Sequence, residues 1–271
     1  MYIFGVYAVI IRIRELLISE SVMDILYRDS LIIIFVSAIL VFILLFFISA
    51  PYGKFLRKGW GPAVKTKWAW MMMEFLSPAL ITLFFILSDS KNIVMILFVV
   101  VWLLHYVHRA FIYPFSQSGR NKPYPLVVVS MAIIFNFFNG FVNGYGVFYL
   151  KEYPVIWLLS WQFILGMILF VAGFIINKIS DEKLRTLRSQ NGQDYVIPQG
   201  WLFKYISCPH YFGELLEWGG WAVMTWSLPG LAFFIFTFAN LFPRAVRTHK
   251  WYREHFEEYP KKRKAIIPFI I

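Results

Sequence analysis

Charged residues and cysteine are scarce in this chain, and two common nucleotide-binding motifs are missing. Only 15% of its 271 residues are charged and 59% are hydrophobic, whereas a soluble domain averages about 25% charged and roughly 45–50% apolar residues. The single cysteine, Cys208, excludes a disulfide framework within the chain. Neither a GxGxxG loop after a strand nor a GxxxxGK(S/T) loop occurs, so a bound nucleotide would be held by side chains from loops and helix ends.

The arrangement of charge and of ligand residues argues against two further classes of function. The formal net charge of +11 lies in short segments between apolar runs and forms no separate basic face, which disfavours nucleic-acid binding. Cys208 and His210 are close in sequence, but no second pair of residues lies at the spacing of zinc ligands. We therefore expect no nucleic-acid partner and no metal ion.

Long apolar runs predict an all-α integral membrane protein with seven transmembrane helices. A helix needs about 20 apolar residues to cross the hydrocarbon core, and runs near this length recur along the chain. They cover residues 31–50, 68–87, 93–107, 125–150, 155–176 and 215–242. The last run contains Pro229, which favours two passes hinged at that proline, although a re-entrant hairpin satisfies the same pattern.

The distribution of Lys and Arg predicts the orientation of these helices. Segments 51–67 and 177–204 each carry five such residues, and the tail after Phe242 carries eight. Positive charge stays on the cytosolic side, so we expect the N-terminus outside and the C-terminus in the cytosol. The membrane is expected to be a bacterial inner membrane or the endoplasmic reticulum. The predicted single domain consists of an interfacial lead-in (1–30), the seven-helix bundle (31–242) and a basic cytosolic tail (243–271).

Two polar side chains lie inside predicted helices at similar depth. Glu74 follows Trp68 by six residues, which places it about 9 Å below the cytosolic surface. Tyr106 lies in the next, antiparallel helix, about 10 Å from the same surface. An ionisable group inside a membrane helix marks a functional site by default, so this pair is a catalytic hypothesis. Alternatively, Glu74 pairs with His105 or Arg109 and only holds helices together.

Amide and acid side chains recur at helical spacing further along the chain. Asn136, Asn139 and Asn143 share one face of the fourth predicted helix. An amide facing lipid would stay unsatisfied, so this stripe should face the bundle interior or a ligand; amides of this kind also join helices to one another. The other two sets are Asn177 with Asp181, and His210 with Glu214 and Glu217.

Several strings in this chain occur in an order and at a spacing that resemble a known family. They are LHYVHRAFIY, KPYP, NGFVNGYG, NxxSD, YVIPQGWLFKYIS, FGELLEWGG, TWSLP and YPKKRKAIIPF, together with Glu74 in the second predicted helix. From about Trp70 to the C-terminus, roughly three-quarters of its length, the chain resembles the steroid 5α-reductases (3-oxo-5α-steroid 4-dehydrogenases). The resemblance implies a seven-helix enzyme that uses NADPH to reduce the Δ4 double bond of a 3-oxo steroid, which enters from lipid.

The resemblance also implies roles for individual residues. Glu74 and Tyr106 would flank the steroid 3-ketone as the catalytic pair, and Trp70 would line the substrate pocket. The implied cofactor-binding residues are Arg120 or Lys122 in a basic loop, Asn177, Asp181, Arg188, Tyr195, His210, Glu214, Arg244 and Tyr252. Met73 stands where the family has a Gln and Met131 where it has an Arg. Both departures would remove polar partners near the ketone and leave the substrate open.

Three other functions are compatible with parts of the sequence. A related membrane reductase could act on a polyprenol or an enoyl thioester. An isoprenylcysteine-type membrane methyltransferase carries an HPxYxGE-like helix, which residues 209–214 match in part, but it would not need Glu74 to face a tyrosine. A transporter or lipid-binding scaffold would not need the cationic surface that three separate segments build above converging polar groups.

Overall fold

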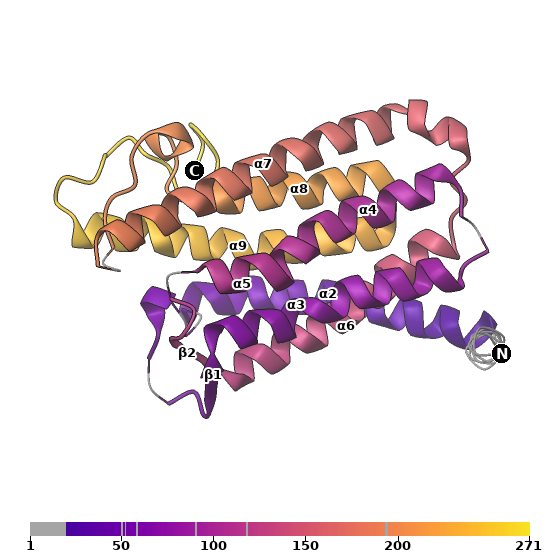
Figure 1. Ribbon diagram of the computed structural model, residues 1–271, viewed down its shortest axis with the longest axis horizontal. Coiled ribbons are helices and arrows are strands. Elements are labelled where there is room, and N and C mark those ends of the chain that lie inside the picture. The colour runs from indigo at the N-terminus through magenta and orange to yellow at the C-terminus, as the bar shows by residue number, and fades with distance from the viewer. Residues whose placement is uncertain are drawn as a thin grey trace.

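The computed structural model describes residues 20–49, 51, 53–57, 59–89, 91–117, 119–192 and 195–271. Residues 1–19 of the predicted lead-in lie outside this described part. The described chain is an elongated bundle of helices with a small two-stranded sheet (Figure 1), so the predicted all-α class is confirmed. Its helices are α2 (Glu20–Phe47), α3 (Thr66–Leu87), α4 (Ile93–Val107), α5 (Tyr113–Ser116), α6 (Leu126–Phe148), α7 (Trp161–Gln190), α8 (Pro209–Thr225) and α9 (Leu228–His255), and its strands are β1 (Ala63–Lys65) and β2 (Pro123–Pro125).

Six stretches of the described chain are long and apolar enough to cross a membrane. They are α2, α3, α4 continued through α5, α6, α7 and α9. Apolar side chains cover the outside of the bundle; on α2, for example, Ile39 is 62% exposed. Such a surface suits lipid rather than water. The protein is therefore a multi-pass integral membrane protein, and α8, with 17 residues, is shorter than these six.

Three helices extend beyond the apolar runs that predicted them, and one of them, α7, continues from residue 176 to Gln190. α2 begins at Glu20, so residues 20–30, which were expected to belong to the lead-in, are helical. Asp24 in this extension accepts a hydrogen bond from the hydroxyl group of Tyr145 on α6 at 3.0 Å. α9 likewise continues to His255, into the predicted tail. Hydropathy marks the part of a helix inside hydrocarbon, whereas the helical backbone continues until its capping sequence or a breaker ends it.

Local capping signals set several helix ends. Asn92 caps the N-terminus of α4 and accepts a hydrogen bond from the backbone N–H of Val94 at 2.9 Å. Ser227 caps the N-terminus of α9 and accepts from the backbone N–H of Gly230 at 3.2 Å, with Pro229 in the first turn. The chain reverses direction between α8 and α9, which pack side by side, close to the predicted hinge (Figure 1).

α7 and α8 approach each other until their backbones touch. Gly166 and Gly173 on α7 face Gly213 and Gly220 on α8. A Cβ atom added at any of these four glycines would lie 2.3–2.5 Å from a backbone nitrogen of the other helix. Small residues permit such close packing between membrane helices. The contact runs from Gly166 to Asn177 on α7 and covers most of the length of α8.

The positively charged segments gather at one end of the bundle. β1 pairs antiparallel with β2, which joins the segment before α3 to the segment before α6. Ile206 forms a bridge with Lys264, which joins the segment before α8 to the tail. In Figure 1 these segments lie at the left, opposite the turn between α8 and α9 at the right. Parts of the chain that are far apart in sequence thus surround a common space.

Candidate active site

A cavity of about 230 Å³ lies at this end, between α3, α7, α8, α9 and the segment 53–56. It is lined by Trp70 and by nine of the ten predicted cofactor-binding residues. These nine are Lys122, Asn177, Asp181, Arg188, Tyr195, His210, Glu214, Arg244 and Tyr252. Arg120 does not line it, because its guanidinium group donates a hydrogen bond to the backbone oxygen of Phe115 at 2.9 Å. Of the two candidates in the basic loop, the geometry therefore favours Lys122.

The contact between α7 and α8 brings four predicted side chains together. The side-chain amide of Asn177 donates a hydrogen bond to the backbone oxygen of His210 at 2.9 Å. Gly213, three residues further along α8, lies directly against the backbone of Asn177. Asp181 and Glu214 follow one helical turn further along their respective helices. All members of the two polar sets predicted on these helices therefore line one cavity, except Glu217.

Arg109 is the centre of the charged part of this site, although the sequence suggested it only as a structural partner of Glu74. Its guanidinium group lies 3.9 Å from the carboxyl group of Glu74, 3.7 Å from that of Asp181 and 3.5 Å from that of Glu214. It also lies 4.4 Å from the centre of the Trp70 ring. The three carboxyl groups are largely buried, and Arg109 lies within ion-pair distance of each of them. Through Arg109, Glu74 adjoins the cavity.

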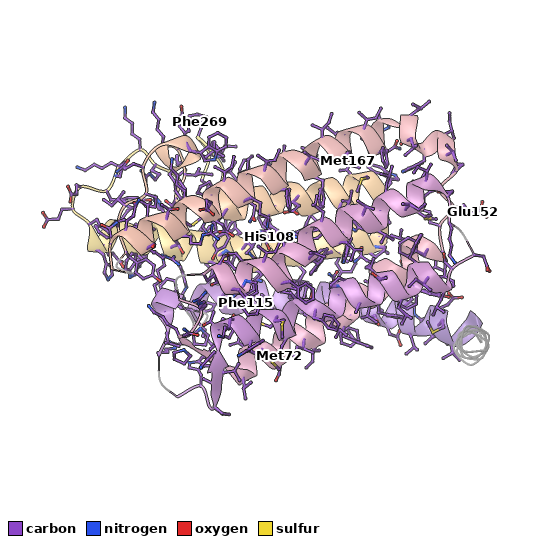
Figure 2. All side chains as sticks on the ribbon, in the orientation of Figure 1. Met72, His108, Phe115, Glu152, Met167 and Phe269 are labelled. Carbon is purple, nitrogen blue, oxygen red and sulfur yellow. The ribbon has the colours of Figure 1, made fainter. Side chains whose placement is uncertain are left out.

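A π-helical turn, His108–Ile112, places Arg109 at this position. The turn lies between α4 and α5, and such turns are frequent at functional sites because they change which side chains face inward. Figure 2 labels His108, the first residue of the turn, near the middle of the bundle. The signal that could have identified Arg109 is the one that identified Glu74, an ionisable side chain within an apolar helix.

Tyr106 lies deeper in the bundle, packed among aromatic rings. It is 2% exposed, and its ring stacks on Trp102 with 5.3 Å between the ring centres. Its hydroxyl group donates to the side-chain oxygen of Asn136 at 3.4 Å, and the amide nitrogen of Asn136 donates to the backbone oxygen of Met73 at 2.8 Å. One amide therefore joins the phenol to the helix segment that carries Glu74. Neither Tyr106 nor Glu74 lines the 230 Å³ cavity itself.

The other two members of the asparagine stripe join helices. The side-chain oxygen of Asn143 accepts a hydrogen bond from the indole N–H of Trp221 at 2.8 Å, which links α6 to α8. The amide nitrogen of Asn143 donates to the side-chain oxygen of Asn139 at 3.0 Å. The stripe is buried as predicted, and both interpretations apply to it. Asn136 contacts the phenol, whereas Asn139 and Asn143 hold the bundle together.

Of the two structural partners considered for Glu74, the structure shows Arg109. His105 instead pairs with Glu217 on α8, with 2.7 Å between Nδ1 and Oε1. Glu217 shares a helical face with Glu214 but does not line the cavity. Met131, which was expected near the ketone, is 60% exposed on α6, so it lies away from the buried phenol.

Cationic and aromatic side chains line the outer part of the cavity. The guanidinium group of Arg188 lies 4.9 Å from the centre of the Tyr195 ring. Arg244 donates a hydrogen bond to the hydroxyl group of Tyr211 at 3.0 Å, and its guanidinium group lies 5.1 Å from the centre of that ring. Contacts of this kind hold a guanidinium group in place over an aromatic face. An arginine held in this way suits phosphate, which it binds through two parallel hydrogen bonds.

The C-terminal tail is fastened beside the cavity by a hydrogen-bonded cluster. The hydroxyl group of Ser207 lies 2.6 Å from Nδ1 of His249, 2.5 Å from the hydroxyl group of Tyr259 and 3.0 Å from the backbone oxygen of Lys264. Burial raises the pKa of Tyr259, so its hydroxyl group stays neutral. Burial also raises the pKa of the neighbouring Cys208 thiol to about 12, which disfavours the thiolate that metal binding requires.

Comparisons with known proteins show which family the chain resembles over most of its length. Residues 122–271 match the family described as 3-oxo-5-alpha-steroid 4-dehydrogenase. The chain is 44% identical over 239 residues to a steroid 5-alpha-reductase of Arabidopsis thaliana, an alignment that covers 84% of this chain and 90% of the relative. It is 39% identical over 241 residues to the 3-oxo-5-alpha-steroid 4-dehydrogenase 1 of Bos taurus, covering 85% and 91%. It is also 39% identical over 226 residues to the type 1 enzyme of Homo sapiens, covering 82% and 86%.

These alignments span most of the chain and of each relative, so the similarity is not confined to a short motif. The resemblance in the sequence is thereby confirmed. The chain belongs to the 3-oxo-5-alpha-steroid 4-dehydrogenase family, and it is a membrane oxidoreductase of the class that acts on CH–CH bonds.

Proposed function

We propose that this protein uses NADPH to reduce the Δ4 double bond of 3-oxo steroids, which yields 5α-reduced 3-oxo steroids. The observation that carries the proposal is that two different environments adjoin through Arg109. One is a cavity lined by cations and polar groups, and the other is the buried region of Glu74 and Tyr106. A dinucleotide requires a cavity lined by cations and polar groups, and an apolar ligand with one ketone requires a buried region with few hydrogen-bond donors. Relatives named for this reaction support it.

The residues of the cavity fit a dinucleotide cofactor. Arg188 and Arg244 would hold its phosphates, because a guanidinium group binds phosphate through two hydrogen bonds. Asp181 and Glu214 also line the cavity, and they would accept hydrogen bonds from hydroxyl or amide groups of the cofactor. Trp70 lies beside Arg109 at the inner end, where a flat ring could pack against it.

Tyr106 and Glu74 are the residues that we assign to the chemistry. When bound, NADPH supplies a hydride to the β-carbon of the enone. Negative charge then develops on the ketone oxygen, and the hydroxyl group of Tyr106 donates a hydrogen bond to it; one such donor is typically worth about 10²–10³ in rate. In the structure this single O–H donates to the side-chain oxygen of Asn136, so it would turn from Asn136 to the ketone when the steroid binds. Glu74 orients the phenol or donates to the same oxygen, and water supplies the proton that the α-carbon receives.

The proposed topology has seven crossings, with α8 as the sixth and the C-terminal tail in the cytosol. The clustering of basic segments at one end supports it, because positive charge stays cytosolic. An apolar steroid would then reach Tyr106 from the lipid. Cysteines introduced as Glu152→Cys and Lys262→Cys, each with Cys208→Ala, test this orientation. An impermeant thiol reagent should label only one of the two in sealed membranes, and labelling of both from one side would contradict seven crossings.

The reaction is tested with purified protein in detergent. NADPH absorbance should fall when a Δ4-3-oxo steroid is added, and the product should carry the 5α configuration by mass spectrometry and NMR. Parallel reactions contain an enoyl thioester, a polyprenol, or S-adenosylmethionine with an isoprenylated cysteine. Turnover of one of these without turnover of any Δ4-3-oxo steroid would refute the proposed substrate, and absence of NADPH consumption with every substrate would refute the reductase.

A further inference from the structure

Lys54 lies in an aromatic cage at the wall of the cavity, in a segment that no motif had singled out. It belongs to a short 3₁₀ turn, Gly53–Phe55, between α2 and β1. Its ammonium nitrogen lies 4.6 Å from the centre of the Trp251 ring and 4.7 Å from that of Tyr252, both on α9. It lies 5.8 Å from the ring of Tyr195. Three rings therefore hold one cation against the cavity.

This cation has no acidic counterpart in the part of the chain that is described. None of the ion pairs there involves Lys54. The titratable groups that face it are Arg188 on α7, Tyr252 on α9, Tyr195 and the thiol of Cys208. Burial lowers the pKa of Lys54 to about 8, and Arg188 adds to this effect. An anionic ligand would relieve the repulsion between these two cations.

The position of Lys54 indicates which part of a dinucleotide would reach it. Glu74 and Arg109 lie at the inner end of the site, where the hydride must be delivered. Arg188 and Lys54 both contact the ring of Tyr195, at 4.9 and 5.8 Å, so they share the outer end. Asn177 and Arg188 are eleven residues apart on α7, which is about 16 Å along the helix. The adenosine half of the cofactor would therefore extend toward Lys54.

We propose that Lys54 binds the phosphate monoester on the adenosine ribose and thereby selects NADPH over NADH. This inference rests on the proposed function and names the residue that sets cofactor preference. The ribose phosphate is the only chemical difference between the two cofactors. A lysine suits it, because an ammonium group acts as a compact point charge for a terminal phosphate. The aromatic cage restrains the side chain, so less conformational freedom is lost on binding.

The test compares Lys54→Met with Lys54→Arg and with Lys250→Met. Met is close to Lys in length but neutral, whereas Arg keeps the charge. Lys250 lies on α9, next to Trp251 of the cage, but it is 76% exposed, pairs with Glu254 at 3.7 Å and does not line the cavity. Its substitution therefore makes the same change in net charge without touching the site. Steady-state kinetics with NADPH and with NADH, at saturating Δ4-3-oxo steroid, measure the preference of each variant.

Lys54→Met should raise KM for NADPH about 10- to 100-fold, because it removes one hydrogen bond between charged groups and such a bond changes affinity by about this factor. It should leave KM for NADH and both kcat values near wild type, and its turnover with NADH shows that it is folded. Lys54→Arg should retain most of the preference, and Lys250→Met all of it. Equal weakening of both cofactors, or no weakening, would overturn the proposal.

Competition experiments on the wild-type protein provide a second measurement if Lys54→Met does not fold. Adenosine 2′,5′-bisphosphate should inhibit NADPH turnover about 10- to 100-fold more strongly than 5′-AMP. Equal inhibition would overturn the assignment of a ribose-phosphate site at Lys54. A wild-type protein that turns over neither cofactor would instead refute the proposed function.

Discussion

The contact between α7 and α8 predicts the effect of a single added methyl group. In Gly213→Ala, the new Cβ would lie 2.5 Å from the backbone nitrogen of Asn177 and 2.7 Å from the backbone oxygen of Gly173. Ordinary contact begins near 3.4 Å, so α7 would have to move by about 0.9 Å. Overpacking of this kind costs about 1–3 kcal/mol. The shift would also strain the hydrogen bond between Asn177 and the backbone of His210.

We therefore expect Gly213→Ala to lower both stability and cofactor affinity. The free-energy loss corresponds to a decrease of a few degrees in apparent Tm for about 250 residues. A misplacement of about 1 Å at a binding residue can cost as much as about 10²-fold in activity. A fluorescence-based thermal shift assay in detergent measures the first effect, and KM for NADPH measures the second.

Gly219→Ala is the matched control for this prediction. Gly219 lies on the same helix, but a Cβ there would meet only the ring of Phe234, at 3.3 Å, and this side chain can move. The control should therefore keep wild-type KM, with apparent Tm unchanged or slightly higher because Ala favours helix more than Gly does. If Gly213→Ala matched wild type in both measurements, the backbone contact would not position the site as argued.

Four further outcomes follow from the same geometry. Tyr106→Phe and Glu74→Gln should each lower kcat, Tyr106→Phe by about 10²–10³-fold. Both variants should still bind NADPH, as measured by the change in tryptophan fluorescence. Wild-type turnover by both variants would remove the two residues from the mechanism. Arg109→Met should destabilise the protein by about 3–5 kcal/mol, because three carboxyl groups lose their shared cation; an unchanged thermal denaturation curve would contradict this. Arg244→Ala should raise KM for NADPH with little change in kcat, and an unchanged KM would exclude it from cofactor binding. Because the pKa of Lys54 is lowered to about 8, its charge is present near pH 7 and is lost as the pH rises through 8. The preference for NADPH over NADH should therefore decline between about pH 7 and pH 9. If the ratio of KM for NADH to KM for NADPH stayed constant over this range, Lys54 would not be the group that sets the preference.

The sequence was most informative about the positions of polar side chains inside apolar helices. Glu74 and the polar faces that carry Asn177 and Glu214 are visible because such groups are costly in lipid. The depth predicted for Tyr106 rests on helix rise alone. Periodicity cannot show, however, which neighbour completes each interaction. That is why His105 and Arg109 remained equal candidates as partners of Glu74, and only the folded chain assigns Arg109 to it.

The sequence by itself determined the membrane class, the family and most of the predicted site residues, because these depend on composition, spacing and ordered strings. Only the tertiary structure decided that Arg109 and Lys54 lie at the cavity. Both contact residues that are distant in sequence, since Arg109 joins α3, α7 and α8, and Lys54 meets α9. Four glycines let the backbones of α7 and α8 touch, and the basic segments meet at one end of the bundle. Both features depend on how distant segments pack in space, so the order of residues along the chain does not reveal them.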